Sequence, residues 1–341
     1  MTAGEFRTDP ITGRVAIMVP GRSARPNDHA APPPSAPADP GCPFCEGNET
    51  RTPSEVAVAA PPGRAPNTRG WWVRTIPNRF PTVTSDAPAP SARPGTTLLA
   101  SGPAFGYHEV VIEDPAHAPT LGFLPREQVH RVLRMFRDRV RYLSGLPNVG
   151  SVTLFENTGP ESGGSLWHPH AQLVTIPGIS PSLQGETEGA ERLRARSGSA
   201  CAFEEIRSVE LQDGRRVVFD TGEFTVFEPF ASAFPFETRV LPVRHAPSFA
   251  SVTDAEIEVL ADLLPSLLRA FLTALPGASY NYVLRTPVAK TAGFEQYHWH
   301  LDLYPRLVRP DGFDLGSGLA VNTVLPEVAA ETLRTTLAAK R

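Results

Sequence analysis

The sequence predicts an α+β fold built by internal duplication, in which each of two halves combines an antiparallel sheet with one long helix. A His-Ala-Pro triplet at residues 117–119 recurs at residues 245–247, which is 128 positions later. A paired-histidine segment at residues 168–170 recurs at residues 298–300, which is 130 positions later. Because the offset hardly changes between two different motifs, we infer that one module occurs twice.

A helical stretch follows each triplet. Its apolar residues fall three or four positions apart, which places them on one face of a helix. These residues are Val129, Val132, Leu133, Phe136, Val140 and Leu143 in the first half, and Ile257, Leu260, Leu263, Leu264, Leu267 and Phe271 in the second. Thr253 and Glu256 form a capping-box pattern at the start of the second helix. We therefore expect each helix to pack its apolar face on a sheet.

Strand patterns surround both helices. Alternating or β-branched segments occur at residues 109–113, 151–155, 223–227 and 280–284. Together with the paired-histidine strands they supply an antiparallel sheet for each half. We expect residues 1–180 to form the N-terminal half, residues 181–220 a connecting segment and residues 221–341 the C-terminal half.

Composition and charge indicate an intracellular protein with small-molecule ligands. The 341 residues carry a net charge of −4 at pH 7 and have a pI near 6.2, so nucleic acid is excluded as the main partner. No stretch approaches the ~18 apolar residues that span a bilayer, and no signal-peptide pattern opens the chain, so no membrane partner is expected. Three cysteines are too few for a disulfide framework, and we expect a cytoplasmic protein.

Two of the cysteines lie in a proline-rich region, in the segment Cys42-Pro43-Phe44-Cys45. This spacing is typical of one half of a tetrahedral zinc site, whose other ligands must then come from the nine histidines. A redox pair and two purely structural cysteines are the alternatives. The pattern alone does not decide among the three.

The first paired-histidine segment is the main candidate for chemistry. On a strand, residues two apart share a face, so His168, His170 and Gln172 are expected to line one pocket wall. The turn at residues 157–165 is rich in backbone N–H groups that can bind a phosphate. No P-loop or GxGxxG pattern occurs. Half-buried histidines with only structural bonds are the alternative, which the duplicated pair and the upstream glycine turn disfavour.

Several further segments occur in an order that resembles a known family. They are Asp9-Pro10-Ile11-Thr12-Gly13-Arg14, Arg22-Ser23-Ala24-Arg25-Pro26, Pro77-Asn78-Arg79-Phe80-Pro81, Asp114-Pro115-Ala116-His117, Phe155-Glu156-Asn157 and His168-Pro169-His170-Ala171-Gln172. With the Cys-x-x-Cys segment, this set resembles the galactose-1-phosphate uridylyltransferase family of the histidine-triad superfamily, from about residue 5 to residue 334. The resemblance implies two fused histidine-triad-like halves, a catalytic pocket led by the first half, and a homodimer.

The resemblance also implies roles for individual residues. His170 corresponds to the nucleophile and Gln172 to a phosphate contact. The implied ligands of one Zn²⁺ per chain are Cys42, Cys45, His117 and His168. The implied nucleotide-binding residues are Arg22, Arg25, Asn78, Asn157, Gly163, Gly164 and Ser165. Neutral imidazole is a good nucleophile at phosphorus, and Gln172 can bond a phosphate oxygen but cannot donate a proton to a leaving group, which favours transfer over hydrolysis.

Two departures from the family pattern limit the resemblance. Some members bind a second metal through a glutamate and three histidines, to which Glu186, His298 and His300 correspond. The remaining position is Arg285, a cation that cannot ligate. We therefore expect no second metal, a pairing of Arg285 with Glu186, and a second histidine pair that is a structural vestige.

The second departure concerns the sugar. Residues 313–322 lack the tyrosine-glutamate pair expected of a galactose-handling enzyme. Residues 106–113 and 281–287 are more similar to the branch typified by plant ADP-glucose phosphorylase. The acceptor therefore stays open.

We expect a nucleotidylyltransferase that acts by double displacement. A nucleoside monophosphate passes from an NDP-sugar to His170 and then to a sugar 1-phosphate or phosphate. The nearest alternative is an NDP-sugar phosphorylase that uses inorganic phosphate. A nucleotide hydrolase and a non-catalytic nucleotide-binding protein are the further alternatives.

Overall fold

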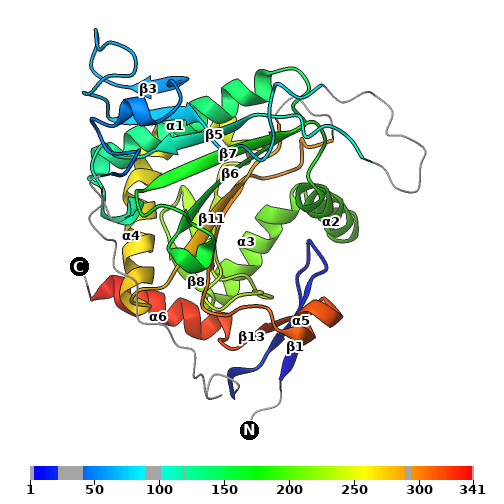
Figure 1. The fold of residues 1–341 in the computed structure, drawn as a ribbon. Coiled ribbons are helices and arrows are strands. Elements are labelled where there is room, and N and C mark those ends of the chain that lie inside the picture. Colours follow the sequence, from blue (N-terminus) through cyan, green and yellow to red (C-terminus); the bar gives the residue numbers. More distant parts are fainter. Residues whose placement is uncertain (1–3, 22–40, 89–100, 118–119, 289–292, 340–341) are drawn as a thin grey trace.

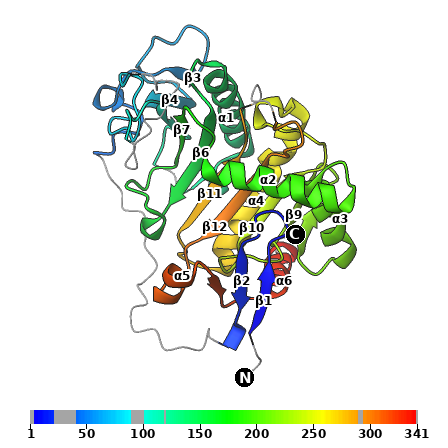
Figure 2. The same ribbon diagram turned by 90° about the vertical axis from the view of Figure 1, so that its right-hand side faces the viewer.

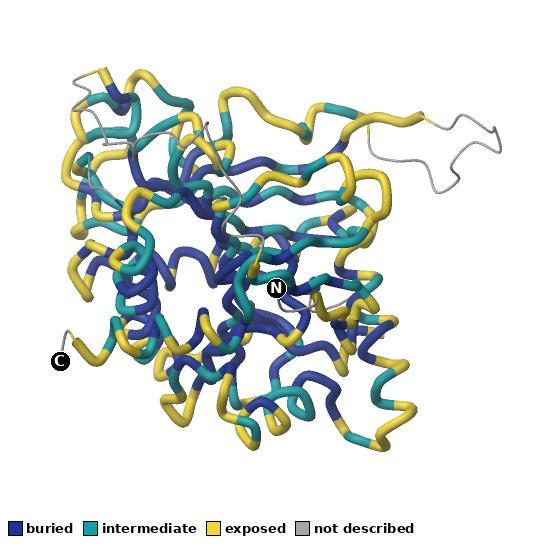
Figure 3. The backbone as a smooth tube through the Cα atoms, turned by 90° about the horizontal axis from the view of Figure 1, so that it is seen from below, coloured by how far each residue is buried: buried dark blue, intermediate teal, exposed yellow. Residues whose placement is uncertain are grey.

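The computed structural model describes residues 4–21, 41–88, 101–117, 120–288 and 293–339. These residues form a central antiparallel sheet of ten strands with helices on both faces, and a small three-stranded sheet beside it (Figure 1). The strand order in the large sheet is β3-β4-β5-β7-β6-β11-β12-β10-β9-β8. Figure 3 shows the buried segments gathered along the centre of the molecule.

The first five strands of this order come from the first half of the chain and the last five from the second. The first five are β3 (Ala57–Ala59), β4 (Val73–Pro77), β5 (His108–Ile112), β7 (His170–Ile176) and β6 (Ser151–Thr158). The last five are β11 (Tyr280–Arg285), β12 (His300–Pro305), β10 (Thr238–Pro242), β9 (Phe224–Phe227) and β8 (Val217–Asp220). Antiparallel pairing of β6 with β11 joins them into one sheet.

This order confirms the predicted duplication. Each half places the strand after its long helix at the centre, as β6 or β11, and the paired-histidine strand next to it, as β7 or β12. One detail differs from the expectation. The paired-histidine strands begin at the second histidine, so His168 precedes β7 and does not lie on it. The boundaries expected at residues 180 and 220 stay a prediction.

Both predicted long helices lie on one face of the sheet. They are α1 (Arg126–Gly145) and α4 (Asp254–Ala274), which pack against each other and against the main hydrophobic core. Thr253 and Glu256 form the expected capping box of α4. The C-terminal helix α6 (Pro326–Ala338) packs against α4. None of the described helices is long and apolar enough to cross a membrane.

The opposite face is covered in the second half. The helices α2 (Pro181–Ser197) and α3 (Ala202–Asp213) pack over β9 and β10, and Figure 2 shows α2 crossing in front of the sheet. The small sheet of β1 (Glu5–Thr8), β2 (Val15–Met18) and β13 (Ala320–Asn322), with the short helix α5 (Gly312–Ser317), adjoins this half. The apolar contacts of α2 and α3 with the sheet involve strands of the second half.

Two carboxyl groups are buried under the first half. Glu113 and Glu156 are 0% and 2% exposed, and the Tyr282 hydroxyl donates to Glu113 while Thr158 donates to Glu156. Burial raises the pKa of Glu156 from 4.5 to about 7, and burial with the neighbouring Glu156 raises the pKa of Glu113 well above its ordinary value. Two carboxylates so close cannot both ionise without repulsion. The pair therefore retains a proton near neutral pH.

This retained proton predicts a pH-dependent stability. A carboxyl whose pKa is higher in the folded than in the unfolded protein stabilises the fold most in acid, and the contribution falls as the pH rises from about 4.5 to about 7. The free energy of unfolding should fall over that range by up to about 1.4 kcal/mol per pH unit. Glu156→Gln should make this fall less steep, because Glu156 no longer holds a proton in the folded protein, while burial still raises the pKa of Glu113. Urea unfolding at several pH values measures it.

Glu191→Gln, which alters an exposed carboxyl on α2, is the matched control and should follow the wild type. An unchanged pH dependence in Glu156→Gln would contradict the assignment of the proton to this pair.

Candidate active site and metal centre

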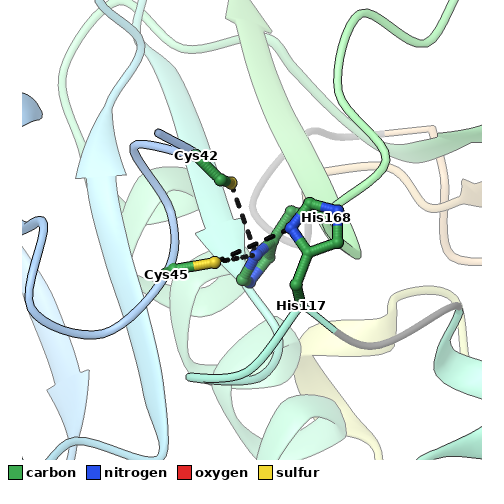
Figure 4. A group of neighbouring side chains, drawn as sticks. All are labelled: Cys42, Cys45, His117 and His168. Atoms are coloured by element: carbon green, nitrogen blue, oxygen red, sulfur yellow. Dashed lines mark hydrogen bonds between the residues drawn. The ribbon is translucent and has the colours of Figure 1, made fainter. Parts of the chain in front are cut away.

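The four expected zinc ligands lie together. Cys42 and Cys45 come from the loop before β3, His117 follows β5, and His168 immediately precedes β7 (Figure 4). His168 Nδ1 lies 3.6 Å from the sulfur of each cysteine, and His117 Nδ1 lies 3.7 Å from Cys45 Sγ. The four ligand atoms all lie within 4.8 Å of one another.

These separations fit a tetrahedral metal ion. Zinc–sulfur and zinc–nitrogen bonds of about 2.3 and 2.0 Å place neighbouring ligand atoms about 3.5 Å apart. His168 Nε2 donates to the Asp114 carbonyl at 2.7 Å, which leaves the lone pair on Nδ1 facing the sulfurs. Burial lowers the pKa of His168 to about 4, so the ring is neutral and able to ligate. The thiols face imidazoles, which favours the metal interpretation over a redox pair.

A second group of possible ligands lies in the other half, and the sequence patterns did not reveal it as a set. It consists of Cys201, Glu204, His245 and His298, whose ligand atoms also lie within 4.8 Å of one another. His245 Nδ1 lies 3.6 Å from Glu204, and Cys201 Sγ lies 3.8 Å from His298 Nδ1. Cys201 and Glu204 repeat the three-residue step of Cys42 and Cys45. A search of the second half for this same three-residue spacing could have found the group.

The other position considered for a second metal is occupied by ion pairs. Arg285 Nε lies 3.8 Å from Glu186 and 3.6 Å from Asp302, so Arg285 pairs with Glu186 as expected. The Tyr297 hydroxyl donates to the same glutamate at 2.5 Å. The carboxylate of Glu186 is therefore already paired with a guanidinium and bonded to a phenol. His300, the counterpart of His170, is 0% exposed there.

His170 is held with one nitrogen ready to react. Its Nδ1 donates to the carbonyl of His168 at 2.7 Å, so the lone pair is on Nε2. Burial lowers the pKa of His170, which keeps the ring neutral at neutral pH. The edge of Phe44, from the loop between the two cysteines, packs on the His170 ring with 5.2 Å between ring centres. A neutral, oriented imidazole is a nucleophile that needs no separate base.

Gln172 lies two residues further along β7 and on the same face of the sheet. Its Oε1 accepts from His108 Nε2 at 2.9 Å and from Asn78 Nδ2 at 3.3 Å. Asn78 was expected at the site, whereas His108 and its contact with Gln172 were not. The side-chain oxygen of Gln172 is thus occupied by protein donors.

The glycine turn lies beside Asn157, at the end of β6. Gly163 has a φ of +85°, and a Cβ on Gly164 would lie 2.8 Å from the Asn157 carbonyl, so the turn requires glycine at both positions. Ser165 is exposed at its end. Asn281 of β11, another residue not expected at the site, donates to Asn157 Oδ1 at 2.7 Å. The expected residues Arg22 and Arg25 lie outside the described residues.

The geometry can now be compared with known proteins. The sequence matches the family model "Galactose-1-phosphate uridyl transferase, N-terminal domain" over residues 2–177, more than half of the chain. The chain belongs to the galactose-1-phosphate uridylyltransferase family. Membership of this family makes it an enzyme, and the two histidine-triad-like halves agree with the solved structures of relatives.

Relatives in this family include two kinds of enzyme. The chain is 29% identical to an ADP-glucose phosphorylase of Arabidopsis thaliana over 334 residues, which cover 97% of this chain and 92% of that protein. It is 26% identical to a galactose-1-phosphate uridylyltransferase of Thermotoga maritima over 346 residues, which cover 97% and 98%. The crystal structure of an ADP-glucose phosphorylase from Arabidopsis thaliana with bound ADP-glucose superposes with a TM-score of 0.83 at 28% identity, covering 98% of each chain.

Replacing one thiolate tests the first ligand group. Cys45→Ser should lower the zinc content of the purified protein by one equivalent per chain, because the site loses a strong ligand. The melting temperature should fall by several degrees, since the loop that carries Phe44 is no longer held. Elemental analysis and calorimetry measure both effects. A metal-free protein as stable as the loaded one would refute the site.

Cys201→Ser is the matched variant of the second group. The expectation of one zinc per chain requires an unchanged metal content in this variant. A loss of a further equivalent would assign a second ion to Cys201, Glu204, His245 and His298.

Proposed function

We propose that this protein transfers a nucleoside monophosphate from an NDP-sugar to a phosphate acceptor through a nucleotidyl-His170 intermediate. The observation that carries the proposal is the bond from His170 Nδ1 to the His168 carbonyl, which leaves Nε2 as a bare nucleophile. Amide groups of Gln172 and Asn157 and the backbone of the glycine turn lie on the same side, and N–H groups of these kinds bind phosphate oxygens.

In the first step, His170 Nε2 attacks the α-phosphorus of the NDP-sugar. A phosphorus–nitrogen bond forms, and the bond from the α-phosphorus to the bridging oxygen breaks. The leaving group is sugar 1-phosphate, which takes that oxygen and the electron pair of the broken bond. Because the leaving group is a stable anion, no acid is needed to protonate it. Gln172, which has no proton to give, suits this step.

In the second step, an oxygen of the acceptor attacks the same phosphorus. The phosphorus–nitrogen bond breaks and its electron pair returns to His170 Nε2. With inorganic phosphate as acceptor the product is a nucleoside diphosphate, and with a sugar 1-phosphate it is a new NDP-sugar. Hydrolysis is disfavoured because water, unlike a phosphate anion, must lose a proton as it attacks.

The acceptor that we propose first is inorganic phosphate, with ADP-glucose as the donor. The similarity to an ADP-glucose phosphorylase along nearly the whole chain supports this choice, as does the missing tyrosine-glutamate pair in residues 313–322. Transfer to a hexose 1-phosphate is the second candidate, supported by the uridylyltransferase relatives. Arg22 and Arg25 are proposed to bind the nucleotide, and a cytoplasmic homodimer with the halves 1–180 and 221–341 is proposed with them.

A zinc ion held by Cys42, Cys45, His117 and His168 would have a structural task here. It would fix His168, whose carbonyl orients His170, and the loop whose Phe44 packs on both rings. The ring of His170 itself remains directed to the substrate.

The covalent intermediate can be observed directly. Incubation with ADP-glucose, UDP-glucose or UDP-galactose in the absence of acceptor should add one nucleoside monophosphate to the chain, because His170 is the neutral nucleophile of the site. Intact-mass measurement detects the adduct, and peptide mapping should place it on His170. His170→Asn should remove it.

His300→Asn is the matched control for this experiment. His300 has the same bond from Nδ1 to a carbonyl two residues earlier, at 3.0 Å, but it is fully buried. This variant should still form the adduct. A wild-type chain that stays unmodified with each of these NDP-sugars would contradict the double-displacement mechanism.

The acceptor is tested by discharging the isolated nucleotidyl-enzyme. Inorganic phosphate should discharge an adenylyl-enzyme at least tenfold faster than galactose 1-phosphate does at equal concentration. Glucose and galactose donors should differ little, since a site that does not pair the sugar 4-hydroxyl discriminates weakly between epimers. Rapid-quench assays measure both rates. If only a uridylyl-enzyme forms and only galactose 1-phosphate discharges it, the result would favour a uridylyltransferase instead.

A further inference from the structure

His108 is a buried histidine of β5 whose ring lies against the side chain of Gln172. It pairs with Val174 of β7, so it shares the face of His170 and Gln172. The residue is only 9% exposed. The ring therefore contacts mainly protein atoms. Which of its two nitrogens carries the proton decides whether it donates or accepts a hydrogen bond at Gln172.

A backbone group fixes the position of that proton. The Thr82 N–H donates to His108 Nδ1 at 3.0 Å, and a backbone amide can only donate, so Nδ1 carries the lone pair. Burial lowers the pKa of His108, which keeps the ring neutral. The single proton is then on Nε2, which donates to Gln172 Oε1 at 2.9 Å.

Asn78 supplies a second donor to the same oxygen. Its own Oδ1 accepts from the Phe80 N–H at 2.8 Å, so its amino group is the part that lies 3.3 Å from Gln172 Oε1 and 3.0 Å from His108 Nε2. Two N–H donors cannot bond each other, so the Asn78 amino group and the His108 Nε2–H are both directed at the Gln172 oxygen. An amide whose oxygen accepts from two donors presents its amino group on its other side. Gln172 Nε2 is thereby turned away from His108 and Asn78.

Asn157 is arranged by the same logic on the neighbouring strand. Asn281 Nδ2 donates to the Ser162 carbonyl at 2.9 Å, and a carbonyl can only accept, so this end of Asn281 is the amino group. The same group donates to Asn157 Oδ1 at 2.7 Å. Two amides at the site thus have their oxygens occupied by protein donors, and neither amino group forms a hydrogen bond with another of the described residues.

We propose that His108, as the neutral Nε2–H tautomer, is a positioning residue that holds the Gln172 amide with its amino group toward the α-phosphate of the bound nucleotide. The proposal rests on the proposed function, which places that phosphate next to His170. An amide has nearly the same shape in both orientations, and the reversed one would aim an oxygen at phosphate oxygens. Without the His108 donor, only the longer bond from Asn78 resists that reversal.

Kinetics of the first half-reaction test the proposal. His108→Phe keeps a ring but removes the donor, and it should lower the rate of His170 nucleotidylation at saturating NDP-sugar by about tenfold to hundredfold, the usual effect of losing such a supporting contact. His108→Gln retains a side-chain N–H and should recover most of the rate. Single-turnover quench experiments measure the rate, and circular dichroism with melting curves shows that each variant is folded.

The double variant separates positioning from general damage. If His108 acts through Gln172, then His108→Phe should cost nothing further in a Gln172→Ala background. Additive losses, or full activity in His108→Phe, would overturn the proposal.

The tautomer is a readout that needs no activity. Long-range proton–nitrogen spectra of the ¹⁵N-labelled full chain, with the His108 signals identified by their absence in His108→Phe, should show a protonated Nε2 and a bare Nδ1 at pH 7. A protonated Nδ1 would refute the assignment. A wild type that no NDP-sugar labels would refute the proposed function instead, while a labelled wild type with an equally fast His108→Phe would refute only the role of His108.

Discussion

One hydrogen bond, from His170 Nδ1 to the carbonyl of His168, connects the candidate metal site to the proposed nucleophile. Residue 168 contributes its imidazole to the Cys42 and Cys45 group and its carbonyl to His170, so only two residues separate the ligand group from the His170 ring. A neutral histidine ring carries one proton on either of its two nitrogens, and this bond places it on Nδ1 of His170. The nucleophile is therefore prepared by the backbone.

The two halves share this bond and differ in what covers it. His300 donates to the His298 carbonyl in the same way, but Phe203 and Tyr297 pack on its ring and α2 and α3 close the face above it. Burial alone would raise the pKa of Asp302, the counterpart of Gln172, but the charge of Arg239 lowers it below its ordinary value. An ion-pair network thus fills the second half beside His300, and the proposed nucleotide site is in the first half.

The sequence predicted what depends on local spacing. The constant offset between the histidine motifs predicted the duplication. Apolar residues three or four positions apart predicted α1 and α4, because helix periodicity is a local property of the sequence. The roles of His108 and Asn281 were not predicted because they depend on strand register. Register places His108 beside Gln172, 64 positions away, and Asn281 beside Asn157, 124 positions away. Cys201 and Glu204 escaped prediction because the substitution of a carboxylate for a thiolate hides the repeat. Long-range pairings of this kind follow from the folded sheet, not from local pattern.

In the proposed function, the orientation of the amides favours transfer over hydrolysis. A third histidine at position 172 could take part in proton transfer to a leaving group, whereas an amide held by its oxygen can only donate hydrogen bonds. In the proposed reaction, such donors stabilise the charge that grows on phosphate oxygens as His170 attacks, and they do so equally for either phosphate partner. The same site would then serve departure of one phosphate and attack by another, which is what reversible exchange between two anionic acceptors requires. Water gains nothing from that symmetry, because it must lose a proton as it attacks and the Gln172 amide cannot accept one.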